Sequence, residues 1–529
     1  MNFRFISLLF LTPLGLAMSS PSDRVISPSL RTHLEMTAPD QDVRVIVRFA
    51  DPTGPVDLST FSGKGRRLAL LEHFRRRADA AERSIQTLLQ QGRVKPGHRL
   101  WAINGMAISL SSETIRHWST DPSVQTISLD AVVQGPSTGR ETSGGFSWNL
   151  PAVQALRLWS AGITGQGVVV ANMDTGVDGE HPDLAAKWRG GTNSWFDPHG
   201  VYIQPHDTDG HGTQTMGIIV GGNTRDRPVG LAPDARWIAV KIFDDNGHAL
   251  LSDIHRGFQW LLDPDGDPQT DDAPDVVNYS WSFPSHVNEC FTEFQADIHL
   301  LKTAGIALVF AAGNQGPLPA TSLSPANNPG AFAVGAVGPD LLVAAFSSRG
   351  PAPCHERRFP DMVAPGVDIT TVDLSFGGRF DDLVTVTGTS FAAAHVAGAM
   401  TLLLNAFPGT PVESLEQALR ESALDLNVPG PDDHSGHGLL DLQNACGLLA
   451  SPSPAGNDPD WSVPAGDINR DGHVDWSDHE LFARQWSNAA VAADAPGFQA
   501  DLNDDGRVDW SDFLLLQTHL FECPEPVDH

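Results

Sequence analysis

The chain has 529 residues, of which 41% are hydrophobic, so it is too long for a single core and predicts roughly three folded domains. Its formal net charge is −30, but residues 1–145 hold 17 basic and 13 acidic side chains, whereas the remainder holds 17 basic and 51 acidic. This asymmetry indicates a basic front part that is separable from an acidic remainder. The acidic surface would repel phosphates, which argues against nucleic acid as a partner.

Residues 1–20 predict a secretory signal peptide. One arginine, Arg4, precedes an apolar run and then small residues, and the run is too short to cross a bilayer comfortably. A buried strand and a membrane anchor are the alternatives. No later stretch is expected to be long and apolar enough to cross a membrane, so no stable membrane insertion is expected.

The following segment alternates between strands and helices. Strands are predicted at 43–51, 100–110 and 124–130, with a charged helix at 65–92 and a short helix near 112–120. This order predicts a small α+β unit of ferredoxin-like type. A linker rich in Gly, Ser and Pro follows at 134–145 and should be easily cleaved.

A larger α/β domain is predicted between about residue 150 and residue 448. Its apolar runs lie at 167–174, 235–244, 275–282 and 305–314, with helical patterns at 251–262 and 291–304. Runs without alternation are typical of strands that are covered on both faces, so we expect a parallel sheet flanked by helices. Ligands bind at the carboxyl ends of such strands, where Asp174 and Asn314 are expected.

Ser390 begins an apolar, small-residue helix, and alone it would be interpreted as a helix cap. Two other segments change that interpretation. Asp174 ends an apolar strand, where a buried carboxylate needs a partner, and His211 stands between two glycines at the start of another helix. Together they supply an acyl-transfer triad, in which the imidazole takes the serine proton and the carboxylate orients the imidazole.

The settings of these residues, "DTG", "GHGT" and "GTSFAAAHVAG", resemble the subtilisin-like serine protease (subtilase) family. The segment "AAGNQGP" resembles the oxyanion-hole motif of that family, which implies that Asn314 is the side-chain donor. "LLDPDGDPQTDDAPDVVNYSWS" and "FSSRGPAPC" resemble its bacillopeptidase F-like branch. The resemblance implies a catalytic domain at residues 147–450 that hydrolyses peptide bonds.

The chain also departs from the family pattern near the nucleophile. Phe391 and Ala394 stand where the family usually has methionine and proline. Ser282 replaces a glycine that opens the specificity pocket, so we expect a modified, shallower pocket. An extended substrate should still pair through its backbone. The residues expected to contact substrate are Ser280, Trp281, Ser282 and Gly313.

Nearby polar residues are interpreted as structural. His395, one helical turn after Ser390, is expected to be a packed histidine, and Asp207 and Asp209 are expected to shape the loop before His211. A further acidic run either holds a calcium ion or is a solvated loop. That run comprises Asp263, Asp265 and Asp267.

The resemblance gives the basic front unit a role, because residues 21–140 are similar to the propeptide of these proteases, which acts as inhibitor and folding assistant. Its charge is opposite to that of the remainder, which favours docking. Maturation is expected to cut within 130–146. The alternative is an accessory domain that is retained after secretion.

The four cysteines lie far apart, with no paired metal-binding spacing. In an exported chain they predict two disulfides, for which three connectivities are open. The favoured pairs are Cys290 with Cys354 and Cys446 with Cys523.

After a Ser/Pro-rich linker at 451–465, the chain carries two similar twelve-residue segments, 467–478 and 501–512. Both match a calcium loop, with oxygen ligands at positions 1, 3, 5, 7, 9 and 12 and glycine at position 6. The first loop would supply Asp467, Asn469, Asp471, the carbonyl of His473, Asp475 and Asp478. The second would supply Asp501, Asn503, Asp505, the carbonyl of Arg507, Asp509 and Asp512.

Aspartate at position 12, with a helix after each loop, resembles the dockerin type I module, here at 466–523. The resemblance implies a small all-α domain with two Ca²⁺ ions and a cohesin-like or cell-surface partner. Trp476 and Trp510, repeated on the two loops, are either part of an interface or packed against the module's own helices.

These observations predict a secreted serine endopeptidase that acts on protein or peptide substrates, is made as a zymogen and carries a calcium-binding tail. The rival interpretation is a catalytically impaired protease fold that serves as a surface-binding or scaffold protein.

Overall fold

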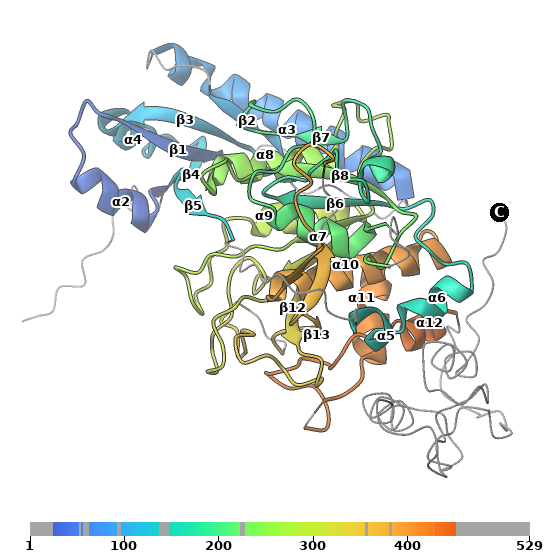
Figure 1. Cartoon of the computed structure of the whole chain (residues 1–529). Helices are drawn as coiled ribbons and strands as arrows, with labels where there is room; N and C mark the ends of the chain where they lie inside the picture. Colours follow the sequence, from blue (N-terminus) through green and yellow to red (C-terminus); the bar gives the residue numbers. More distant parts are fainter. Residues whose placement is uncertain are drawn as a thin grey trace, which may run out of the picture. The chain divides into compact units, whose positions relative to one another are not determined.

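The computed structural model describes residues 25–450, except 52–53, 55, 57–62, 92–96, 137–147, 223–227, 355–357, 380–382 and 427. The predicted signal peptide, the 451–465 linker and both calcium loops lie outside the described residues. The described chain forms two compact units (Figure 1). The front unit comprises residues up to 60, 69–132 and 250–252, and the main unit comprises 61–68, 133–249 and the residues from 253 onward.

The front unit contains a four-stranded antiparallel sheet in the order β2-β3-β1-β4. Its strands are β1 (Asp42–Phe49), β2 (His98–Leu100), β3 (Gly105–Ser111) and β4 (Val124–Leu129). Its helices are α2 (Pro28–Glu35), α3 (Gly63–Gln91), whose first turns belong to the main unit, and α4 (Ser112–Trp118). The order β1, α3, β3, α4, β4 follows the predicted alternation. Buried Val45, Val47, Ile108, Ile115 and Trp118 contribute to the core.

The prediction of a single strand over 100–110 is wrong. The segment is a hairpin of β2 and β3, with the short 3₁₀ helix η1 (Trp101–Ile103) between the two strands. Asn104 causes the break, because it takes a left-handed conformation with φ of 53°. Its side-chain amide donates to the carbonyls of Phe49 and Ala50, which compensates for burying it.

The main unit contains the predicted parallel sheet, with seven strands in the order β13-β12-β11-β10-β6-β8-β7. The strands are β6 (Val169–Asp174), β7 (Trp195–Phe196), β8 (Arg236–Lys241), β10 (Val276–Tyr279), β11 (Ala307–Ala311), β12 (Phe332–Val337) and β13 (Met362–Pro365). Their side chains are almost all buried, as expected for strands covered on both faces. The fold class predicted for this domain is confirmed.

Alternating residues of β6 show which helices cover each face of the sheet. The Asn172 amide donates to the carbonyl of Gly212 in α7 (His211–Val220), and α10 (Thr389–Ala406) packs beside α7. The next residue, Met173, faces Gly257 of α8 (Leu251–Leu262) on the opposite face. α9 (Gln295–Thr303) follows Phe294, which packs against Phe258 of α8.

Shorter elements complete the main unit. The remaining helices are α5 (Asn149–Ala152), α6 (Ala155–Ser160), η2 (Ala185–Lys187), α11 (Val412–Ser422) and α12 (Leu442–Ala450). Two-stranded pairs are formed by β14 (Ile369–Val372) with β15 (Leu383–Val386), and by β5 (Val132–Gln134) with β9 (His248–Leu250).

Helix α10 is the central helix of the core. By length and composition it could cross a membrane, so the expectation that no stretch after the N-terminus would qualify is wrong. However, 83% of it is buried within the domain, where its many alanines allow close packing against α7 and β10–β13. Its apolar character is that of a core helix.

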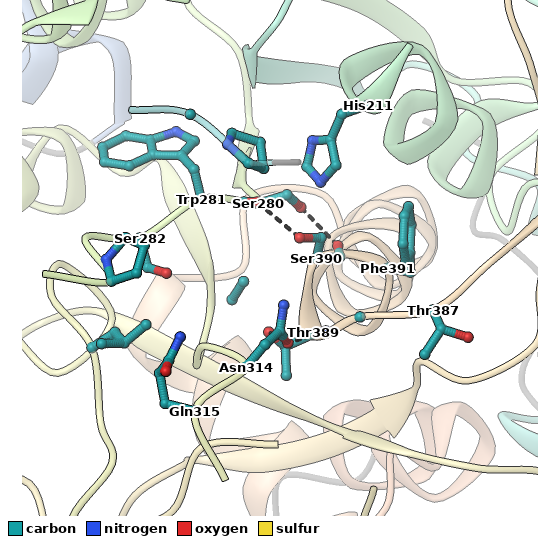
Figure 2. Close-up of a pocket in the computed structure, with 16 residues that line it drawn as sticks. His211, Ser280, Trp281, Ser282, Asn314, Gln315, Thr387, Thr389, Ser390 and Phe391 are labelled. Atoms are coloured by element: carbon teal, nitrogen blue, oxygen red, sulfur yellow. Dashed lines mark hydrogen bonds between the residues drawn. The ribbon is translucent and has the colours of Figure 1, made fainter. Parts of the chain in front are cut away.

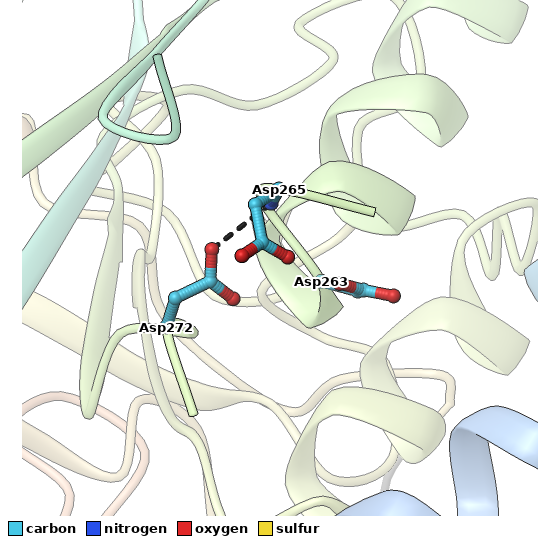
Figure 3. Close-up of side chains that lie close together, drawn as sticks. All are labelled: Asp263, Asp265 and Asp272. Atoms are coloured by element: carbon cyan, nitrogen blue, oxygen red, sulfur yellow. Dashed lines mark hydrogen bonds between the residues drawn. The ribbon is translucent and has the colours of Figure 1, made fainter. Parts of the chain in front are cut away.

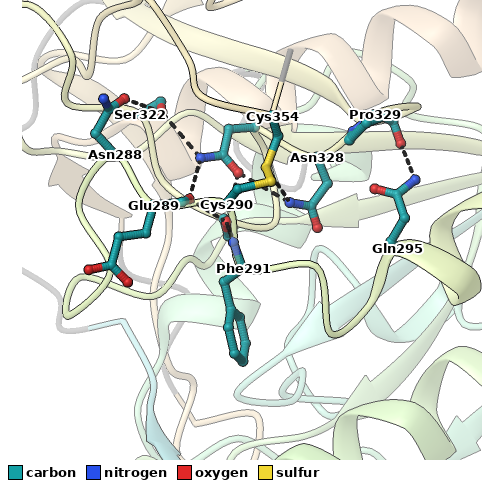
Figure 4. The surroundings of a disulfide bond; sticks show 11 residues. Asn288, Glu289, Cys290, Phe291, Gln295, Ser322, Asn328, Pro329 and Cys354 are labelled. Carbon is teal, nitrogen blue, oxygen red and sulfur yellow. Dashed lines mark hydrogen bonds between the residues drawn. A yellow bond between two sulfur atoms is a disulfide. The ribbon is translucent and has the colours of Figure 1, made fainter. Parts of the chain in front are cut away.

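The predicted Cys290–Cys354 disulfide is present, with its Cα atoms 5.2 Å apart (Figure 4). It lies where the segment around residue 290 is hydrogen-bonded to the 322–328 segment. The Ser324 hydroxyl and the Asn327 amide both donate to the Glu289 carbonyl. The Cys446–Cys523 pairing stays a prediction, because Cys523 lies outside the described residues.

Candidate active site

Asp174 and His211 form a buried hydrogen-bonded pair at the carboxyl edge of the sheet. Asp174 is the last residue of β6 and His211 is the first residue of α7. His211 Nδ1 lies 2.8 Å from Asp174 Oδ1, and both side chains are almost fully buried. The close approach needs glycine at position 212, because a Cβ there would lie 2.0 Å from the carbonyl oxygen of Gly176.

The loop before His211 is held by the two aspartates that were expected to shape it. Asp207 accepts bonds from the backbone N–H groups of Asp209, Gly210 and Thr213, and from the Thr213 hydroxyl. Asp209 accepts the backbone N–H of His211. These bonds use the free N–H groups at the start of α7 and fix the position from which the imidazole leaves the backbone.

The acidic surroundings change the electrostatics of the imidazole. Burial alone would lower the pKa of His211, but the charge of Asp174, its hydrogen bond and the nearby Asp209 and Asp207 together raise it above the ordinary value. Burial raises the pKa of the Asp209 carboxyl. The site therefore favours the imidazolium that a general base must form when it accepts a proton.

Ser390 lies in the first turn of α10, on the other side of the same site (Figure 2). Its hydroxyl donates to the carbonyl of Ser280 at 3.0 Å, and the Ser280 hydroxyl donates to the carbonyl of Ser390 at 2.7 Å. Within the described part of the chain, no hydrogen bond joins the Ser390 hydroxyl to His211. The expected direct bond is thus replaced by a reciprocal pair of serines.

Ser390 and His211 nevertheless line the same cavity, which has a volume of about 240 Å³. Its lining includes His211, Ser390, Asn314, Ser280 and Phe391. The centroids of the His211 and Phe391 rings lie 5.8 Å apart, so the bulky side chain that follows Ser390 packs beside the imidazole.

Asn314 is held with its amide nitrogen available. Its Oδ1 accepts from the backbone N–H of Thr389 at 3.0 Å and from the Thr389 hydroxyl at 2.8 Å. These bonds orient the amide, and the residue is exposed at the cavity. This is the arrangement that an oxyanion donor requires, because Nδ2 remains free to bind a ligand oxygen.

The four residues predicted to contact substrate differ in their placement. Ser280, Trp281 and Ser282 line the cavity, although the strand expected to include them ends at Tyr279. The Trp281 side chain is buried and donates to the carbonyl of Met173.

Gly313 is not among the cavity-lining residues. Its N–H donates to the Thr389 hydroxyl and its carbonyl accepts from Ser348. A Cβ there would lie 2.6 Å from Leu323, so close packing requires the glycine.

Comparison with known proteins shows to which family the sequence is similar. Residues 165–438 match the subtilase family, and subtilisin E of Bacillus subtilis (strain 168) is 31% identical over 345 residues, which cover 65% of this chain and 81% of that protein. The chain belongs to the subtilase family. Subtilases are serine endopeptidases, and residues 465–521 additionally match the dockerin type I domain.

Two other relatives are matched over smaller shares of their own length. Bacillopeptidase F of Bacillus subtilis (strain 168) is 30% identical over 418 residues, which cover 72% of this chain but only 28% of that protein. The minor extracellular protease Epr of the same strain is 28% identical over 355 residues, covering 63% of this chain and 48% of that protein. The chain therefore spans less than a third of the length of bacillopeptidase F.

His395 of the subtilase domain has the packed position that was expected. Its Nε2 lies 2.8 Å from the Asn149 amide and its Nδ1 lies 2.8 Å from the carbonyl of Phe391. Burial lowers the pKa of His395 to about 4. It is a neutral core residue that supports the first turn of α10.

The acidic run of the subtilase domain is arranged differently from the prediction. The carboxylates that lie close together are those of Asp263, Asp265 and Asp272, whereas Asp267 is not part of the group (Figure 3). Asp272 accepts the backbone N–H of Asp265, and Asp265 accepts that of Asp267, so the acids stabilise their own turn. Asp265 is exposed, as expected for a solvated acidic loop.

Sequence reasoning missed a segment that enters the site. Gly135 and Pro136, placed in the linker by the sequence, line the cavity together with His211 and Ser390. They follow β5, which pairs with β9. The short apolar run Val132–Val133 before Gly-Pro was the available signal for an edge strand that ends at the site.

Proposed function

We propose that the chain is a secreted serine endopeptidase in which Ser390, His211 and Asp174 form the catalytic triad. The observation that carries the proposal is the 2.8 Å bond from His211 to Asp174 at the edge of a cavity that also contains Ser390 and the amide of Asn314. Secretion is supported by the apolar N-terminal segment and by the similarity to Epr, which is named a minor extracellular protease.

The chemistry follows from these positions. The Ser390 hydroxyl rotates from the Ser280 carbonyl toward the imidazole, transfers its proton to His211 and attacks the peptide carbonyl. Asp174 stabilises the imidazolium, which then protonates the leaving amine. Asn314 Nδ2 and the Ser390 N–H hold the oxyanion, and water releases the acyl group from Ser390.

A serine-directed phosphonate tests this proposal, because it labels only a serine that is activated as a nucleophile. We expect covalent labelling of Ser390 in the matured protein and none in the Ser390→Ala variant, read out by mass spectrometry. The bond from Ser390 to Ser280 instead of His211 favours the rival scaffold function. Unlabelled Ser390, together with intact casein after long incubation, would establish that rival.

The proposal includes synthesis as a zymogen, with residues 21–140 as propeptide and residues 147–450 as the catalytic domain. Its support is the segment Gly135–Pro136, which lies in the cavity. The Ser390→Ala variant should keep the front unit covalently attached, while the wild type loses it by a cut within 130–146. Loss of the front unit from the Ser390→Ala variant in a host without other proteases would contradict self-processing.

We also assign a calcium-dependent docking function to residues 466–523, with cohesin-like proteins as the partner class. Six oxygen donors per loop, mostly carboxylates, fit Ca²⁺, which would link the ligands of each loop and stabilise its turn. Calorimetry of the full chain should detect about two ions. Asp467→Ala and Asp501→Ala together should remove that binding, and unchanged calcium uptake would refute the assignment.

A further inference from the structure

The two residues that follow β5 lie at the candidate active site. β5 pairs with β9, and the next residues, Gly135 and Pro136, form part of the cavity wall with Ser390 and Asn314. A peptide added to a strand edge is held through its backbone, and neighbouring side chains then decide which residues fit. Gly135 and Pro136 therefore indicate what the site accepts at two successive positions.

A backbone hydrogen bond fixes the position of Gly135 beside the cavity. Its N–H donates to the carbonyl of Gly247 at 2.7 Å. That carbonyl belongs to a rigid turn, in which the Asp244 carboxylate accepts the N–H groups of Asn246 and His248 and its carbonyl accepts the N–H of Gly247. A peptide that makes the same bond must pass the same wall.

That wall leaves no space for a side chain. A Cβ on Gly135 would lie 2.9 Å from both Cγ and Cδ1 of the Phe243 ring, well inside van der Waals contact. Gly135 is not in the left-handed region, so the backbone itself would accept other residues. The glycine is required by space and not by conformation.

Phe243 has little freedom to move away. The side chain is 1% exposed and meets Trp281 edge to face, with ring centroids 6.2 Å apart. Trp281 is itself buried and held by the bond from its indole N–H to the Met173 carbonyl. A shift of Phe243 would therefore disturb two packed aromatic rings.

We propose that Phe243 makes this protease select substrates with glycine immediately before the residue whose carbonyl Ser390 attacks. The register follows because Gly135 is still held by its bond to the Gly247 carbonyl, so Pro136, which also lines the cavity with Ser390 and Asn314, is the first residue beyond that bond. The inference rests on the proposed endopeptidase function and adds a substrate class, Gly-X peptides cut after X. In the chain itself, it assigns the maturation cut to the bond after Pro136.

Two peptide pools test the selection in the matured wild-type enzyme. One contains Val-Val-Gln-Gly-X-Ser-Thr and the other Val-Val-Gln-Ala-X-Ser-Thr, with X varied over the natural residues and a fluorophore–quencher pair at the ends. We expect kcat/KM for the alanine pool to be lower by about 10- to 100-fold, because one methyl group is forced into a packed wall. Product masses should show cleavage after X.

Variants of two aromatic residues test whether Phe243 causes the preference for glycine. Phe243→Ala should bring the two pools within about threefold of each other, and Phe243→Leu, a milder change if the alanine variant folds poorly, should narrow the gap. Phe283→Ala is the matched control, because Phe283 also packs on Trp281 but is not among the atoms nearest to Gly135. It should keep the wild-type preference.

The outcomes separate this inference from the function on which it rests. If casein is hydrolysed, three results would overturn the selection by Phe243 and leave the protease function intact. They are equal rates on the two pools, no cleavage of either pool, and cleavage at a bond other than the one after X. Absence of casein hydrolysis together with absence of phosphonate labelling would remove the proposed function and this inference with it.

Discussion

Two buried histidines of the main unit make nearly the same bond to an aspartate. His211 Nδ1 lies 2.8 Å from Asp174, and His255 Nδ1 of α8 lies 2.9 Å from Asp297 of α9. Both imidazoles are 1–2% exposed. Burial alone would lower both pKa values, but the neighbouring carboxylates raise both, that of His255 to about 9.

The other ring nitrogen separates the two pairs. Nε2 of His255 is occupied, because it lies 3.2 Å from Glu293, and the ring packs 4.8 Å from that of Phe294. Nε2 of His211 makes no hydrogen bond within the described residues, and its ring borders the cavity of Ser390. A raised pKa and a histidine–carboxylate bond thus do not by themselves identify a catalytic base. The proposal for His211 depends on its unbonded Nε2 at the cavity of Ser390.

The largest expected effect tests that distinction directly. His211→Ala should lower kcat/KM by about 10,000-fold or more, because it removes the proposed base. Its free energy of unfolding should fall less than that of His255→Ala, because His211 makes one carboxylate bond and His255 makes two. His255→Ala should leave kcat/KM per folded molecule within about threefold of wild type. Peptide hydrolysis and chemical denaturation of both variants provide the two readouts. Similar losses of activity in the two variants would contradict the different roles given to His211 and His255.

A smaller effect is expected for Asn314, which lines the same cavity as His211. Asn314→Ala should lower kcat about 100- to 1,000-fold with little change in KM, because the amide acts on the charge that develops in the transition state. Gln315→Ala, an exposed neighbour that also lines the cavity, is the matched control and should change kcat much less. A loss confined to KM would assign Asn314 to substrate binding.

The architecture was largely predictable because buried parallel strands and amphipathic helices leave local patterns. Residues 251–262 were predicted as a helix and form α8, and each of the four apolar runs contains one strand of the sheet. The strands β12 and β13 were not predicted, since "FAVGAV" and "MVAP" are short runs that contain Ala, Gly or Pro and mark no element clearly. The hairpin at 100–110 was missed because Asn104 in a left-handed conformation is a property of a single residue.

The residues of the proposed triad could be recognised in the sequence for another reason, namely that glycines and small residues surround each of them. Contacts between distant segments had no such local mark. The Ser390–Ser280 bond joins residues 110 apart, and the Gly135–Phe243 contact joins the predicted linker to the segment that follows β8. The His255–Asp297 pair was invisible as well, because either residue alone is typical of a helix surface.

The smallest expected effect is the pH dependence of the stability that the His255–Asp297 pair contributes. The pKa of His255 is raised from 6.5 to about 9 by Asp297 and Glu293 in spite of burial. The folded state therefore holds this proton more tightly than the unfolded chain does. Its stabilisation, about 3 kcal/mol from the shift, is present in full below pH 6.5 and is lost as the pH rises through about 9.

The measurement is the free energy of unfolding of wild type minus that of His255→Gln, followed from pH 6 to pH 10 by chemical denaturation at constant calcium. Glutamine cannot take up the proton, so the difference should fall with rising pH and level off above about pH 9. Glu289→Gln is the control, because its partner His286 is surface-exposed and the pair should contribute little at any pH. A wild-type advantage that stayed constant across this range would show that His255 is neutral in the folded protein. The buried His255–Asp297 pair would then be a neutral hydrogen bond, and it would resemble the His211–Asp174 pair only in its bond length.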